Sequence, residues 1–70
     1  MSPMDRELLD RISDRTSRRL DVVSLYAAAI RADVGDGADW KAINRAIVAR
    51  WSLSALNWIK REAWRAVAAG

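Results

Sequence analysis

The sequence predicts an all-α protein, a small three-helix bundle in which residues 1–70 form a single helical domain. The stretch from Asp39 to Val67 contains no Gly or Pro and carries all four tryptophans. Apolar residues of the first half recur at about 100° per residue, the spacing of an α-helix. Between the halves, Gly35 to Asp39 is the one clear loop. We therefore expect a long N-terminal helix over about 4–33 and two shorter helices over about 39–51 and 53–68.

The composition excludes most classes of small enzyme. The chain has no Cys and no His, which removes a structural zinc site, a thiol nucleophile and a Ser-His relay. The acidic residues of the first helix are spread at ion-pair spacing rather than converging on a pocket, and no Gly-rich phosphate loop exists. We expect a protein that is not an enzyme and that needs no cofactor or metal.

The charge permits an acidic partner. The chain has 12 basic and 9 acidic residues, a net charge of +3 and a pI near 10.2. It has no run of about 18 apolar residues, and Met1–Leu20 is charged throughout, so the sequence predicts neither a membrane span nor a signal peptide. We expect a cytoplasmic protein, bacterial or viral in style.

The N-terminal helix is predicted to begin at Ser2 and Pro3, an N-cap residue followed by a proline at the first helical position. Its apolar stripe keeps one phase and consists of Leu8, Leu9, Ile12, Leu20, Val23, Ala27, Ile30 and Val34. A polar run at 13–19 interrupts this stripe, so either one helix continues, straight or kinked, or two shorter helices meet near Thr16 and Ser17. We prefer the continuous helix because the charges around the run include three pairs at i,i+4 spacing: Arg6 with Asp10, Glu7 with Arg11, and Asp14 with Arg18.

Two helices are predicted after the loop, where Gly35 is placed to close the first helix and Asp36 or Asp39 to cap the next. The first apolar set is Trp40, Ile43, Ile47 and Trp51, and the second is Leu53, Leu56, Ile59, Ala63 and Val67. On one continuous helix the two sets would lie about 180° apart. We therefore predict a break at residues 51–54, where a Ser can cap the last helix.

Trp58 is predicted to lie on the polar side of the last helix, among Asn57, Arg61, Glu62 and Arg65. Two interpretations stay open. Either Trp58 packs against the first helix or is shielded by Arg side chains, or it is a contact surface for another copy, another protein or a nucleic acid. Trp40 and Trp51 are expected in the core.

The segment from Ala46 to Ser54 resembles the first helix and turn of a helix-turn-helix DNA-binding motif. An apolar residue comes early, another precedes the turn, a small residue opens it, and an apolar residue and a Ser begin the recognition helix. The residues in these places are Ile47, Trp51, Ser52, Leu53 and Ser54. The segment departs from the motif at Ser52 and Val48, where Gly and a small residue are favoured, and at Arg61, where a late apolar residue is expected.

The resemblance implies that the last helix enters the major groove, with Ser54, Ala55, Asn57 and Arg61 facing bases and Lys41, Arg50 and Lys60 near phosphates. The predicted function is a small nucleic-acid-binding regulator, a homodimer because one module of this size offers little surface. The alternative is a small protein-interaction module or inhibitor with an exposed Trp and Arg surface. Under either hypothesis, the candidate binding residues are Lys41, Arg50, Ser54, Asn57, Trp58, Lys60, Arg61 and Arg65.

Overall fold

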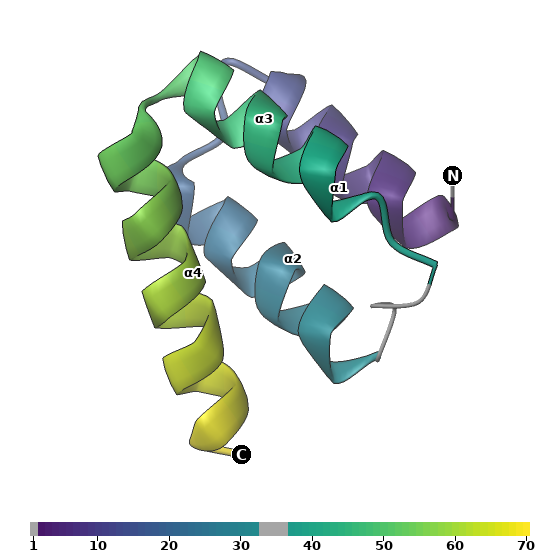
Figure 1. Cartoon of the computed structure of the whole chain (residues 1–70), viewed down its shortest axis with the longest axis vertical. Coiled ribbons are helices and arrows are strands. Elements are labelled where there is room, and N and C mark those ends of the chain that lie inside the picture. Colours follow the sequence, from purple (N-terminus) through teal and green to yellow (C-terminus); the bar gives the residue numbers. More distant parts are fainter. Residues whose placement is uncertain (1, 33–36) are drawn as a thin grey trace.

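The computed structural model describes residues 2–32 and 37–70, and this part of the chain folds into four α-helices (Figure 1). The helices are α1 (Pro3–Ser13), α2 (Arg19–Arg31), α3 (Trp40–Arg50) and α4 (Leu53–Ala68). The predicted all-α class is confirmed. The predicted count of three helices is wrong, because the N-terminal half forms two helices instead of a single long one.

The break between α1 and α2 follows from the polar run at its centre. Asp14 is the C-cap residue of α1, and its backbone N–H donates to the carbonyl of Asp10. Its carboxylate accepts hydrogen bonds from the backbone N–H of Thr16 at 2.9 Å and from the Thr16 hydroxyl at 2.7 Å. The N–H of Arg18 donates to Asp21 at 2.8 Å and begins α2. Such local bonds between side chains and backbone compete with continuation of a helix. The alternative of two shorter helices is therefore the correct one.

The charge pairs that favoured a continuous helix do not form ion pairs. Among the residues described, the salt bridge is instead between Arg65 and Glu62, at 3.3 Å. Asp14, one of the expected pair members, is engaged by Thr16. Exposed i,i+4 pairs contribute only about 0.2–0.5 kcal/mol each, too little to outweigh the packing gained when the two helices fold against each other.

The predicted helix starts are confirmed where the structure describes them. Ser2 and Asp5 form a reciprocal capping box at the start of α1, with Pro3 in its first turn. Asp39 caps α3 by accepting from the N–H of Ala42, and Ser52 caps α4 by accepting from the N–H of Ala55. The predicted break between the last two helices is confirmed, since α3 ends at Arg50 and α4 begins at Leu53. The expectations for Gly35 and Asp36 lie outside the described residues.

The four helices form two parallel pairs. α1 and α3 lie side by side and run in the same direction (Figure 1). At their N-terminal ends the Asp5 carboxylate accepts from the N–H of Asp39 at 3.2 Å, and at their C-terminal ends Arg50 donates to the carbonyl of Ile12 at 2.7 Å. α4 runs along α2, and the Arg31 guanidinium donates to the carbonyl of Ala66 at 2.9 Å. Because the chain changes direction between α3 and α4, α4 packs along α2 instead of continuing along the axis of α3.

All four helices contribute to one hydrophobic core. Its buried residues are Leu8, Ile12, Val22, Val23, Tyr26, Ala27, Ile43, Ile47, Leu56, Ile59 and Ala63. Trp40 and Trp51 are partly buried and pack against it, and the Trp40 ring lies 4.7 Å from that of Tyr26. Leu53 belongs to the apolar set predicted for the buried side of the last helix. This prediction is wrong, because the Leu53 side chain is 62% exposed. As the first residue of α4, it lies about 100° around the helix from the mean direction of the buried residues.

Candidate functional site

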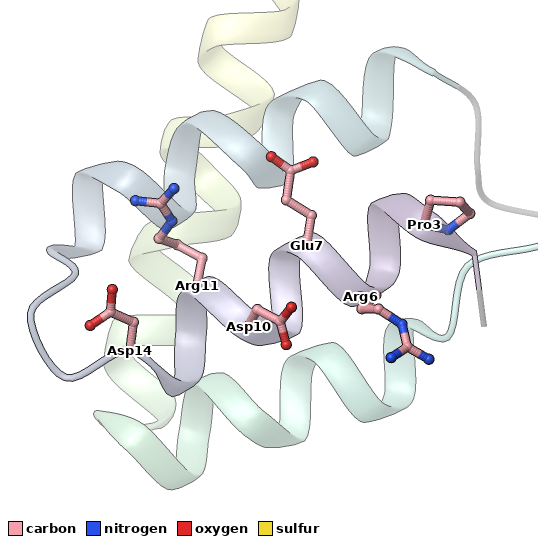
Figure 2. A pocket seen from close by; sticks show the side chains of 6 residues that line it. All are labelled: Pro3, Arg6, Glu7, Asp10, Arg11 and Asp14. Carbon is pink, nitrogen blue, oxygen red and sulfur yellow. The ribbon is translucent and has the colours of Figure 1, made fainter.

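A shallow depression on the outer side of α1 is lined by Pro3, Arg6, Glu7, Asp10, Arg11 and Asp14. All of these residues belong to α1 or its C-terminal cap, so one helix supplies the whole lining. Figure 2 shows Glu7 and Arg11 pointing to one side of the helix and Arg6 to the other. Acidic and basic side chains alternate, and the lining residues do not converge on a common centre. This depression has the character of a solvated helix surface.

A second hollow lies where α1 and α3 end, and it is lined by Ile12, Ser13, Arg15, Ala46, Ala49 and Arg50. The Arg50 guanidinium donates four hydrogen bonds, of 2.6 to 3.1 Å, to backbone carbonyls around the α1–α2 junction. The acceptors are the carbonyls of Ile12, Asp14, Arg15 and Ser17. The guanidinium carbon also lies 4.4 Å from the centre of the Trp51 ring. Arg50, expected at a phosphate or a partner, therefore has four of its five N–H donors engaged with backbone carbonyls of the protein itself.

The most distinctive surface is the outer face of α4, the side turned away from α2 (Figure 1). We define it by seven exposed side chains: Leu53, Ser54, Asn57, Lys60, Arg61, Trp64 and Arg65. Positions 53, 57, 60 and 64 recur every three to four residues, so they form one stripe along the helix. Leu53 is 62% exposed and Trp64 is 56% exposed. Two large apolar side chains thus lie on one face in contact with water.

The exposed tryptophan of α4 is Trp64 and not Trp58. Trp58 is partly buried and packs against the core, on the flank of α4 where Glu62 and Ala66 are partly buried too. This outcome matches the interpretation in which Trp58 is covered. Trp64 lies on the opposite flank with Leu53. The exposed aromatic side chain that the other interpretation assigns to Trp58 is therefore Trp64, which is 56% exposed.

Charge is distributed unequally along the chain. From Trp40 onwards the sequence has six basic residues and one acidic residue, Glu62. Glu62 lies on the covered flank of α4 and pairs with Arg65 at 3.3 Å. The outer face of α4 carries Lys60, Arg61 and Arg65 and contains no Asp or Glu. This face is consequently basic as well as partly apolar.

Five of the eight predicted binding residues share the outer face of α4: Ser54, Asn57, Lys60, Arg61 and Arg65. The remaining three do not. Trp58 is on the covered flank, Arg50 is engaged with the α1–α2 junction, and Lys41 lies in the first turn of α3, about 14 Å along that helix from Arg50. The sequence interpretation missed Leu53 and Trp64. Their separation of eleven residues, three helical turns, is the signal that places them on one side.

Comparison with known proteins gave no match: no family model, no curated protein and no solved structure matches this chain. Within the described ranges, no three metal-ligating side chains come together. None of the helices in this part of the chain is both long and apolar enough to cross a bilayer.

Proposed function

We propose that the protein is a protein-interaction module and that the outer face of α4 is its binding surface. One observation carries this proposal: Leu53 and Trp64 are both more than half exposed and lie on the same side of one helix. Monomeric surfaces expose single apolar side chains commonly, but an aromatic and a leucine aligned on one face are typical of a contact surface.

The energetics favour a partner that covers both side chains. Complete burial of a Leu side chain is worth about 1.5–3 kcal/mol, and Trp and Arg are the residues that most often dominate protein interfaces. Trp64 is flanked by Arg61 and Lys60 one turn earlier, which supply polar contacts at the rim of such an interface.

A second candidate function is a nucleic-acid-binding regulator. It is favoured by the presence of Asn57, Lys60 and Arg61 on one exposed face, since Asn pairs with adenine, Arg with guanine and Lys with phosphate. We rank it second because of Leu53. In a helix-turn-helix pair, an apolar residue at the start of the second helix stabilises the pair only when it is buried. Leu53 is at this position and is exposed.

The two candidates are distinguished by site-specific crosslinking. A photoreactive amino acid replaces Asn57 in the outer face of α4, and the matched control places it at Lys41, which is exposed on α3. After irradiation in an extract of the source cells, we expect a crosslinked product from the Asn57 position whose size nuclease treatment does not change. The Trp64→Ala substitution should abolish this product.

Other results would contradict the proposal. A product sensitive to nuclease would support the regulator instead. Equal products from the two positions, or a product that persists after Trp64→Ala, would exclude the outer face of α4 as the binding surface.

A further inference from the structure

The outer face of α4 has apolar ends and a basic centre. Leu53 and Trp64 are separated by about 16 Å along the helix axis, at 1.5 Å per residue. Asn57, Lys60 and Arg61 lie between them. We propose that the partner segment is an acidic amphipathic helix, with apolar residues that meet Leu53 and Trp64 and carboxylates that meet the basic side chains. This inference rests on the proposed function and specifies the chemistry of the partner.

The acidic character of the partner follows from the charges that would be buried. Lys60 and Arg61 lie between the two apolar side chains, so a partner that covers both ends also removes water from the middle. Desolvating a charge is costly unless an opposite charge replaces the lost water. The face itself has no carboxylate to offer, because Glu62 lies on the covered flank. The partner must supply the negative groups, which would also steer its approach.

The helical form of the partner follows from hydrogen bonding. The outer face of α4 presents side chains only, since the helix has used its own backbone groups between its two ends. An extended strand laid on this face would leave buried N–H and C=O groups without partners. A helix satisfies its own backbone and presents side chains every three to four residues, the spacing of Leu53, Asn57, Lys60 and Trp64.

A second copy of the chain fits this surface poorly. Packing α4 against α4 of another copy would bring Lys60 and Arg61 against the same basic residues, a repulsive arrangement. Elsewhere in the described part, the exposed large apolar residues are Leu20 on α2 and Val48 on α3, one on each helix. Neither α2 nor α3 therefore offers a pair of anchors that matches Leu53 and Trp64.

The test uses a synthetic helical peptide of about three heptads, with Leu at the core positions and Glu at the flanking ones. Its counterpart replaces every Glu by Lys, and a mixed-sequence duplex of about 20 base pairs serves as a third probe. Binding to the full chain is measured by calorimetry at low and moderate salt. We expect the Glu peptide to bind at least about tenfold more tightly than the Lys peptide, and salt to weaken its binding.

Variants of the chain assign the binding to the outer face of α4. Leu53→Ala and Trp64→Ala should each weaken the Glu peptide about tenfold, while circular dichroism shows unchanged helix content. Leu20→Ala is the matched control, because Leu20 is exposed to the same extent, 62%, but lies on α2. It should change affinity by less than about twofold. The double variant Lys60→Glu/Arg61→Glu should reverse the preference between the two peptides.

Four outcomes would overturn the inference. The first two are equal affinity of the chain for the Glu and Lys peptides, and a loss of affinity in Leu20→Ala as large as in Leu53→Ala or Trp64→Ala. The other two are displacement of the Glu peptide by the duplex through the same residues of α4, and a dimer in sedimentation that Trp64→Ala dissociates. If Asn57 crosslinks to a protein but the peptides are not discriminated, the partner chemistry is wrong and the proposed function stands. If the crosslink is absent as well, both fail.

Discussion

Arg50 is expected to hold the fold together at the point where all four helices come close. Its guanidinium donates to four carbonyls of the α1–α2 junction, and it is the last residue of α3, directly before the turn into α4. The substitution Arg50→Ala removes all four bonds at once. We predict that it lowers the free energy of unfolding substantially and leaves the outer face of α4 chemically unchanged.

The magnitude follows from the surroundings of each bond. The bonds to Ile12 at 2.7 Å and Ser17 at 3.0 Å are partly buried, whereas those to Asp14 and Arg15 are exposed. The two partly buried bonds contribute about 1 kcal/mol each, and the exposed carbonyls regain water. Contact with the Trp51 ring adds about 0.5 kcal/mol. The total is about 2–3 kcal/mol, which lowers the melting temperature of a domain of this size by about 10–20 °C.

The assay is urea denaturation followed by circular dichroism, with two companion variants. Arg50→Lys should recover less than half of the loss, because an ammonium group cannot reproduce the planar fork of a guanidinium. Arg45→Ala, at an exposed position on the same helix, should stay within about 0.5 kcal/mol of the parent. A loss below about 0.5 kcal/mol for Arg50→Ala, or full recovery by Lys, would refute the reasoning.

Three further predictions concern the core and the titrating groups. Tyr26→Phe should cost about 1 kcal/mol, because the hydroxyl donates to Asn44 at 2.9 Å. Burial raises the pKa of Tyr26 above its ordinary value of 10.0, so stability should hold below that pH and fall above it, and urea titrations should show no such fall in the Phe variant. Hydrogen bonds from the Thr16 hydroxyl and backbone lower the pKa of Asp14 below 3.8. The stability that Asp14 provides should therefore be present above pH 3.8 and be lost as the pH falls through the lowered pKa, whereas thermal melts of Asp14→Asn should lack this loss. Ile59→Ala, at a fully buried position, should cost about 2–5 kcal/mol in denaturation experiments.

The last two helices could be predicted closely from the sequence because their signals are local. The apolar stripe changes side between Trp51 and Leu53, and a Ser lies where a cap is needed. The break between α1 and α2 could not be predicted as well. The helical phase of the apolar residues is the same before Asp14 and after Arg18. The break is decided by a set of hydrogen bonds. Four of them come from Arg50, which lies 33 to 38 residues along the chain from the carbonyls that it binds. The polar run makes the local bonds of Asp14 and Arg18 possible, but no local pattern shows the contribution of Arg50.

The candidate site was predicted in part. Asn57, Arg61 and Arg65, which the sequence predicts on the polar side of the last helix, are exposed, whereas Glu62 of the same predicted side is partly buried. Leu53 belongs to the apolar set predicted for the buried side, but its position about 100° from the mean direction of the buried residues leaves it 62% exposed. The basic excess after Trp40 is also visible in the sequence, as six basic residues against one acidic residue.

The covering of Trp58 and the exposure of Trp64 have one cause, the direction in which α4 packs. Both side chains lie more than 100° from the mean direction of the buried residues of α4, on opposite flanks. The helical spacing alone therefore does not predict which of the two is buried. α4 contacts α3 as well as α2, and the flank of Trp58 is the partly buried one. Trp64 then has no neighbouring helix in the described part of the chain to cover it and remains 56% exposed. Because no helix of the described part covers the Trp64 side chain, we propose that a partner covers it.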